Sequence, residues 1–206
     1  MTTTTSITKR IVLISTNTAT CLSWLRVLVI LLLYNRSLWE SGDICENKLR
    51  PALFTSLAIS TIELVTALFG FTRSKPLQVL LFASVRTGTE VLVTPLIGCT
   101  SWQHLFTVGC WSLGEVIRFG CFALDGIMTD SKLAKSIRYY VGPILFPLGA
   151  SGEMCMVLRA ASMGRGHLYL AAMLWPAGFY PLMRQLLRQR RKHFAGHFKK
   201  AEIKQI

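Results

Sequence analysis

Six ionisable side chains stand inside long apolar stretches of the sequence. They are Glu63, Arg86, Glu90, Glu115, Arg118 and Glu153. A charge at the centre of a membrane helix costs roughly 2.5–3.5 kcal/mol on insertion scales, so six in contact with lipid would cost on the order of 15 kcal/mol or more. We therefore expect all six to face the interior of a helix bundle, where such charges form ion pairs or do chemistry.

Two pairs among these residues are spaced for contact along one helix face. Arg86 and Glu90 are four residues apart, and Glu115 and Arg118 are three apart, so each pair predicts a local ion pair. A structural role and a functional role remain open for both pairs. Glu63 and Glu153 have no cation at such a spacing. A desolvated carboxylate of this kind suits general acid or base work on a substrate that enters from the bilayer.

The segments that carry these residues have the length of membrane spans. The chain has 206 residues and a mean hydropathy of +0.44, and its 16% of charged residues is well below the roughly 25% of a soluble domain. A bilayer requires about 20 apolar residues per helix. Segments of about this length lie at 22–39, 52–72, 76–98, 102–125, 136–159 and 167–187. The sequence predicts an all-α, multi-pass membrane bundle of about six transmembrane helices.

The charge distribution predicts how the chain is oriented and divided. We expect a polar cytosolic N-terminus at 1–21, a six-span membrane domain at 22–187 and a basic cytosolic tail at 188–206. The net charge is +13, and Arg184 to Lys204 holds eight Lys or Arg and one acid. With six spans, this tail and the basic connections fall on one side, the cytosolic side by the positive-inside rule. These connections contain Lys9, Arg10, Arg73, Lys75, Lys132 and Lys135.

Two features leave alternatives open or exclude a class. Arg26, Asn35 and Arg36 interrupt the first apolar segment, so five spans, or a first segment that lies partly in the interface, is the alternative to six. The six cysteines are far apart and have no nearby His at metal-ligand spacing, so we expect small apolar side chains and no metal or cofactor. No basic stripe is interleaved with stacking aromatics, which argues against a nucleic-acid partner.

The fifth segment is unusual because the stretch RYYVGPILFPLGASGEM contains Pro143 and Pro147 among three glycines. We expect this helix to be kinked or locally unwound, either for simple packing or because it lines a cavity. Tyr139, Phe146 and Glu153 follow each other at intervals of seven residues. In an unbroken helix they would lie within about 40° of one face, which would present aromatic rings and a carboxylate together.

These segments resemble the 3-hydroxyacyl-CoA dehydratases of very-long-chain fatty acid elongation, a family once described as protein-tyrosine-phosphatase-like. The most specific elements are WSLGEVIR and FPLGASGE. The full set is Leu33-Tyr34-Asn35, IELVTALFGFTRS at 62–74, Arg86, WSLGEVIRF at 111–119, RYYVGPILFPLGASGE at 138–153 and GFYPLMRQLLRQRRK at 178–192. Phosphatase chemistry is excluded, because no cysteine has the C-x5-R spacing of a phosphate-binding loop.

The resemblance implies a protein of the endoplasmic reticulum membrane with six spans and both termini in the cytosol. It implies a lyase that removes water from a (3R)-3-hydroxyacyl-CoA to give the trans-2-enoyl-CoA. It also implies the elongase, 3-ketoacyl-CoA reductase and enoyl-CoA reductase as partners. The basic residues Arg73, Lys75, Lys132 and Lys135 would contact the CoA phosphates or serve only as orientation signals.

The family uses a Tyr and a Glu seven residues apart as its acid–base pair. The Glu aligns with Glu153, but the Tyr aligns with Phe146, which has no hydroxyl. Phe82, Phe119 and Phe122 replace further polar residues of the family, and the stretch 40–50 is acidic in place of apolar. The chain is therefore a divergent member.

Phe146 leaves three interpretations open. Glu153 acts with another phenol (Tyr139, Tyr140 or Tyr180), or it acts alone at a reduced rate, or the chain is a non-catalytic membrane partner of the elongation enzymes. We favour retained dehydration because Glu153 and the other buried charges are all present. A small transporter built on the intramembrane carboxylates is a remote alternative, since the sequence has no repeated halves.

Overall fold

The structure is a computed structural model that describes residues 2–40, 42–72, 75–128 and 132–202. Within these ranges every regular element is a helix. No strand occurs in these ranges, so the predicted all-α fold is confirmed. Two of the elements, η1 and η2, are π-helical turns. In chain order the elements are α1 (Thr2–Leu33), α2 (Asn35–Glu40), α3 (Gly42–Ile44), η1 (Cys45–Leu49), α4 (Arg50–Leu68), α5 (Pro76–Gly88), η2 (Thr89–Val93), α6 (Thr94–Ile97), α7 (Trp102–Ile127), α8 (Lys132–Ser162) and α9 (Leu168–Glu202).

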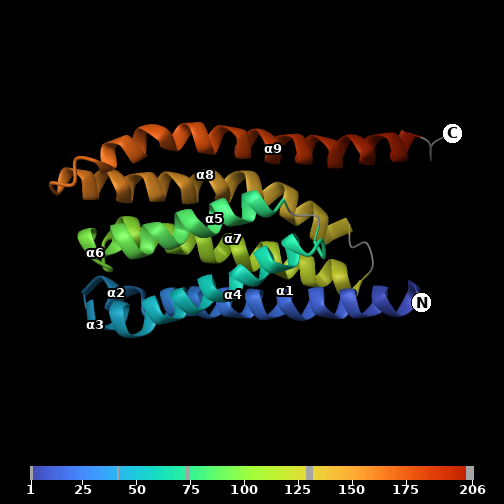
Figure 1. Ribbon diagram of the computed structural model, residues 1–206, viewed down its shortest axis with the longest axis horizontal. Helices are drawn as coiled ribbons and strands as arrows, with labels where there is room; N and C mark the ends of the chain where they lie inside the picture. Colours follow the sequence, from blue (N-terminus) through green and yellow to red (C-terminus); the bar gives the residue numbers. More distant parts are fainter. Residues whose placement is uncertain (1, 41, 73–74, 129–131, 203–206) are drawn as a thin grey trace.

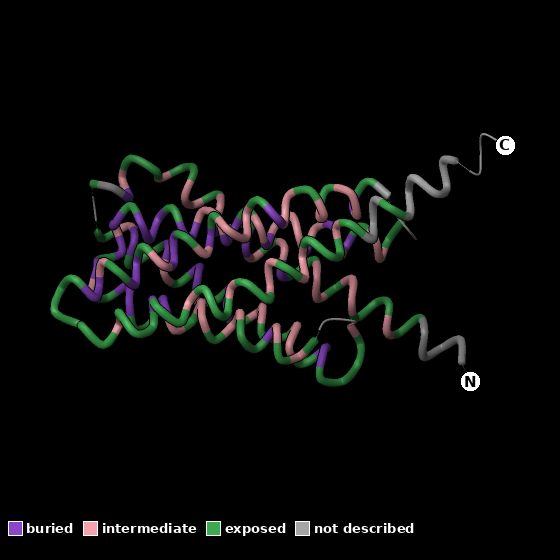
Figure 2. The backbone as a smooth tube through the Cα atoms, turned by 90° about the horizontal axis from the view of Figure 1, so that it is seen from above, coloured by how far each residue is buried: buried purple, intermediate pink, exposed green. Residues whose placement is uncertain are grey.

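The long helices lie side by side in an elongated bundle with both termini at the same end (Figure 1). At the opposite end lie α2, α3, α6 and the turn between α8 and α9. Helix α7 packs against α1 on one side and α8 on the other, while α9 packs against α8 and α4 against α1. Buried residues are concentrated in the half of the bundle away from the termini (Figure 2).

Five helical segments of the described chain are long and apolar enough to cross a membrane. They are Ile7–Leu33, Gly42–Leu68, Pro76–Ile97, Trp102–Ile127 and Leu133–Ser162. Many of their large apolar side chains are exposed on the outside of the bundle, as a lipid-facing surface requires. The sixth long helix, α9, runs beside α8, but it continues into the basic tail. The chain is therefore a multi-pass membrane bundle, and full crossing by α9 remains a prediction.

The first span lies further toward the N-terminus than the predicted segment 22–39. Helix α1 begins at Thr2, and its apolar span ends at Leu33. The polar residues that follow form the separate helix α2, where Arg36 and Glu40 pair at 2.9 Å. Because these charges belong to a different helix, they do not interrupt the span.

Two basic residues tie the N-terminal part of α1 to neighbouring connections. Lys9 Nζ donates to the carbonyl of Gly70 at 2.9 Å, and Arg10 Nε donates to the carbonyl of Gly126 at 2.7 Å. Carbonyls near helix C-termini lack partners within their own helix, so cations stabilise them. These contacts explain why the predicted polar N-terminus is helical.

Helix α8 is continuous from Lys132 to Ser162, although Pro143 and Pro147 lie inside it. Of the two predicted outcomes, a kink or a local unwinding, the structure shows a bend, which lies in the N-terminal half of the helix (Figure 1). Each proline removes one backbone hydrogen bond, and a bend accommodates the loss without unwinding. The widened turns of the bundle lie elsewhere, in η1 and η2.

A disulfide joins Cys45 to Cys99 at the end of the bundle away from the termini. The expectation that all six cysteines are simple apolar side chains is wrong for these two, while Cys21, Cys110, Cys121 and Cys155 are free thiols. The bonded cysteines are 54 positions apart in the sequence, and this spacing matches no recognised cysteine motif. The bond fixes η1 against the connection between α6 and α7.

Replacement of Cys45 by Ser removes this cross-link. A disulfide across 54 residues restricts the unfolded chain, and the chain-entropy estimate for its loss is up to about 4 kcal/mol. We expect a lower melting temperature of the purified protein in detergent. Cys155→Ser is the control, because Cys155 is a free and exposed thiol. Equal melting temperatures for the two variants would contradict a stabilising cross-link.

Candidate active site

The two most specific sequence motifs face each other across α7 and α8. WSLGEVIRF belongs to α7, and FPLGASGE belongs to α8. The glycines permit this contact: a Cβ at Gly152 would overlap Thr107 Oγ1, and one at Gly149 would lie 3.5 Å from Trp111 Cδ1. The small residues of the second motif therefore let α8 approach α7 closely beside Glu153.

Glu153 is buried at this contact, with 7% of its surface exposed. The indole N–H of Trp111 donates to Glu153 Oε1 at 2.8 Å. Arg86 attracts the same carboxylate electrostatically, and its guanidinium lies 5.5 Å from the centre of the Trp111 ring. No cation within the described ranges forms a salt bridge with Glu153, as predicted from its spacing. Glu153 is thus held mainly by a neutral donor.

A chain of ion pairs runs from Arg86 to Glu63 across three helices. Arg86 Nη1 lies 2.6 Å from Glu115 Oε1, and Arg118 Nη2 lies 2.7 Å from Glu115 Oε2. Arg118 Nη2 also lies 2.8 Å from Glu63 Oε2. The predicted Glu115–Arg118 pair is confirmed. No cation lies three or four residues from Glu63 in α4, but Arg118 of α7 supplies one, which the sequence could not reveal.

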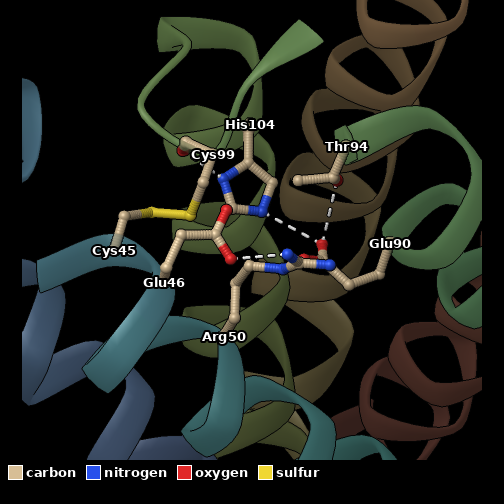
Figure 3. The surroundings of a disulfide bond; sticks show 7 residues. All are labelled: Cys45, Glu46, Arg50, Glu90, Thr94, Cys99 and His104. Carbon is tan, nitrogen blue, oxygen red and sulfur yellow. Dashed lines mark hydrogen bonds and ion pairs between the residues drawn. A yellow bond between two sulfur atoms is a disulfide. The ribbon is translucent and has the colours of Figure 1, made fainter. Parts of the chain in front are cut away.

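The predicted pair of Arg86 with Glu90 is wrong, because Arg86 instead pairs with Glu115 of α7. Glu90 lies in the π-helical turn η2. Glu90 is fully buried and instead contacts His104 Nε2 at 3.0 Å and Arg50 Nε at 3.4 Å (Figure 3). Thr94 Oγ1 donates to Glu90 at 3.2 Å.

The Glu90 cluster is attached to the disulfide through His104. The imidazole Nδ1 of His104 lies 2.7 Å from the carbonyl of Cys99, which only accepts hydrogen bonds, so Nδ1 carries the proton (Figure 3). Its other ring nitrogen, Nε2, lies 3.0 Å from Glu90 Oε2, so the imidazole joins the Cys99 carbonyl to the buried carboxylate. His104 and Arg50 were not singled out from the sequence, although a His in an apolar run was a usable signal.

Three side chains with metal-ligating atoms gather at this cluster. The ligand atoms of Cys45, Cys99 and His104 lie within 4.8 Å of one another. The two sulfurs are bonded to each other, however, and it is a thiolate that binds a metal. With the disulfide formed, the cluster cross-links the bundle and lacks the thiolates that a metal centre would need.

Phe146, at the position of the family tyrosine, belongs to an aromatic stack. Its ring lies parallel to Phe179 of α9 at 5.1 Å and edge-on to Phe82 of α5 at 5.7 Å. Tyr139 accepts a hydrogen bond from Arg138 at 3.2 Å. It is fourteen residues from Glu153, or about 21 Å along α8. Tyr139 is therefore not brought to the carboxylate.

An apolar groove of about 380 Å³ lies between α8 and α9, beginning at the residue after Glu153. It is lined by Met154, Leu158, Tyr169, Ala172, Met173 and Pro176. Of the five tyrosines, Tyr169 is the one that lines this groove, together with Met154, the residue after Glu153. No sequence feature had singled out Tyr169.

Comparison with known families identifies the class of this bundle. The family model described as protein tyrosine phosphatase-like protein, PTPLA, matches residues 57–196, which include both facing motifs. The chain belongs to this family.

Two curated relatives match at low identity. A very-long-chain (3R)-3-hydroxyacyl-CoA dehydratase of Caenorhabditis elegans is 27% identical, with 92% of this chain and 97% of the relative covered. A probable very-long-chain (3R)-3-hydroxyacyl-CoA dehydratase of Schizosaccharomyces pombe is 25% identical, with 66% of this chain and 70% of the relative covered. No solved structure matches the chain.

Substitution of Gly152 tests the close approach of α8 to α7. We expect Gly152→Ala to destabilise the protein by about 1–3 kcal/mol, because the new methyl group overlaps Thr107. Thermal unfolding in detergent measures the change. Gly149→Ala is the matched control, since its Cβ meets only ordinary contacts. Thr107→Ala combined with Gly152→Ala should recover part of the loss, and failure of both contrasts would refute the contact.

Replacement of Arg118 by Gln tests the chain of ion pairs. It leaves the buried carboxylates of Glu63 and Glu115 with too little positive charge, and such a broken buried pair costs about 3–5 kcal/mol. Adding Glu63→Gln should restore part of the stability. Arg36→Gln is the control, because the Arg36–Glu40 pair is largely exposed and contributes at most about 1 kcal/mol. Equal losses for Arg118→Gln and Arg36→Gln would contradict a stabilising network.

Proposed function

We propose that this chain dehydrates (3R)-3-hydroxyacyl-CoA to trans-2-enoyl-CoA, with acid–base chemistry centred on Glu153. The observation that carries the proposal is the buried Glu153 carboxylate, held by Trp111 where the two most specific motifs of the family meet. Family membership and the names of both relatives, which are dehydratases, support dehydration as the reaction class. The apolar groove between α8 and α9, which Met154 lines but Glu153 does not, offers room for an acyl chain.

One carboxylate is sufficient to balance the reaction. Glu153 takes a proton from C2 of the substrate, and the electrons of that C–H bond form the C2–C3 double bond as the C3–O bond breaks. The leaving oxygen takes the proton back from Glu153 and departs as water. Trp111 orients the carboxylate throughout, because its N–H donates to one oxygen and leaves the other for the substrate.

Phe146 determines how fast such a site would work. A phenol at this position would help the hydroxyl leave, and Phe has no proton to give. The stack with Phe82 and Phe179 gives Phe146 an apolar role between α5, α8 and α9. We therefore favour Glu153 acting without the family tyrosine, at a reduced rate.

The proposed location is the endoplasmic reticulum membrane, with both termini in the cytosol. The disulfide supports this orientation, because it lies at the end opposite the termini and disulfides persist in the oxidising lumen. The basic tail supports it independently through the positive-inside rule.

A second candidate is a non-catalytic membrane partner of elongation enzymes. The observation that favours it is the apolar packing of Phe146 where the family has a proton donor. This candidate predicts that cells tolerate Glu153→Gln but not loss of the whole protein.

Dehydratase activity of three purified proteins tests the reaction. We expect Glu153→Gln to lower kcat by about 10²- to 10⁴-fold, because an amide neither accepts nor returns the proton. Phe146→Tyr should raise kcat if the added hydroxyl reaches the substrate. Enoyl-CoA formation from 3-hydroxyacyl-CoA is followed in detergent or nanodiscs.

The control is Phe69→Tyr, which adds a phenol to a largely exposed ring at the C-terminal end of α4. Wild-type protein without activity, together with normal growth of Glu153→Gln cells, would sink the enzymatic proposal and favour the partner role.

A further inference from the structure

The start of α5 and the C-terminal half of α9 enclose a recess of about 480 Å³. Its α5 wall belongs to the half of the bundle nearer both termini, where α5 begins (Figure 1). Three cations line it: Lys75, Arg184 and Arg188. Among the described residues that form its walls, none is acidic. The recess therefore concentrates positive charge in a concave surface, which attracts anions.

The recess is held together by a direct contact between its two walls. Gln78 Nε2 of α5 donates to Gln185 Oε1 of α9 at 2.5 Å, and Gln185 Nε2 donates back at 3.3 Å. Gln185 is itself part of the lining. The amide pair fixes α5 against α9, so Lys75 and the two arginines face one space although about 110 residues separate them.

Helix α9 connects this recess to the apolar groove near Glu153. The groove ends at Pro176 and the recess begins at Tyr180, so about 6 Å of helix separate them. From Met173 in the groove to Arg184 in the recess the distance along the axis is about 16 Å. The two hollows fit a ligand with an anionic head, an extended linker and an apolar chain.

We propose that Lys75, Arg184 and Arg188 bind the phosphates of the CoA head group of the substrate, an inference that rests on the proposed acyl-CoA chemistry for its choice of ligand. CoA carries a diphosphate and a 3′-phosphate, which suits a recess with several cations better than the single phosphodiester of a lipid. Arginine binds phosphate oxygens through two parallel hydrogen bonds. Arg73, also expected at the phosphates, lies outside the described residues, and so does the side chain of Lys132. Lys135 does not line the recess.

Binding of CoA to the full-length protein in nanodiscs of zwitterionic lipid tests the site without catalysis. Arg184→Gln, Arg188→Gln and Lys75→Gln should each weaken CoA binding by about tenfold or more, because each removes charge-assisted hydrogen bonds. Arg191→Gln is the matched control, since Arg191 carries the same charge on the same helix but does not line the recess. Dephospho-CoA should bind wild type more weakly than CoA does.

Kinetics give a second readout. The three recess variants should raise KM for a 3-hydroxyacyl-CoA and leave kcat unchanged, and the same acyl group on N-acetylcysteamine should not distinguish them from wild type. Unchanged CoA affinity in all three variants would overturn the proposal. So would variants that lose only binding to anionic-lipid nanodiscs, which would assign the recess to lipid head groups.

The two proposals fail separately. Glu153→Gln should bind CoA as wild type does, so an inactive wild-type protein whose recess variants still lose CoA affinity would contradict only the dehydratase reaction. An active enzyme with recess variants that behave as wild type would contradict only the phosphate site.

Discussion

Arg118 holds two buried carboxylates at once, and much of the bundle interior depends on this contact. Glu63 of α4 and Glu115 of α7 both lie within 2.8 Å of its guanidinium. Glu115 also forms an ion pair with Arg86 of α5. In lipid each of these groups alone would be expelled toward water. Paired, they fix three helices in one register, and Arg86 then lies close enough to act on Glu153. The charges thus position the candidate site as well as join the helices.

The small residues of α8 act together with this network. Glycine at 152 lets the backbone of α8 approach Thr107 of α7, next to the Glu153 carboxylate that accepts the N–H of Trp111. Without hydrophobic driving force between helices in a membrane, close packing of small residues is a principal source of association. The motif FPLGASGE therefore combines a packing surface with the acid–base group. Its conformation needs no break in the helix, since α8 stays continuous through both prolines.

The sequence was sufficient for the features that depend on local pattern. Apolar length predicted the membrane helices, and three-residue spacing predicted Glu115–Arg118. It was insufficient where tertiary contact decides. Nothing local to Glu63 indicates that Arg118 lies opposite, and nothing local to Arg86 and Glu90 indicates that each finds its partner on another helix. The disulfide and the His104–Glu90 contact join residues of different elements, which only the packed fold brings together.

The two ends of the bundle have opposite characters, and this asymmetry connects the fold to its proposed chemistry. The end away from the termini is cross-linked by the disulfide and by the buried Glu90–His104–Arg50 cluster (Figure 3). The other end holds the open recess between α5 and α9 and has no disulfide in the described chain. In the proposed reaction a long amphiphilic substrate would use two parts of the bundle: the interior that holds one carboxylate, and the basic opening for its charged head. The line along α9 from recess to groove would then join these two parts into one binding site.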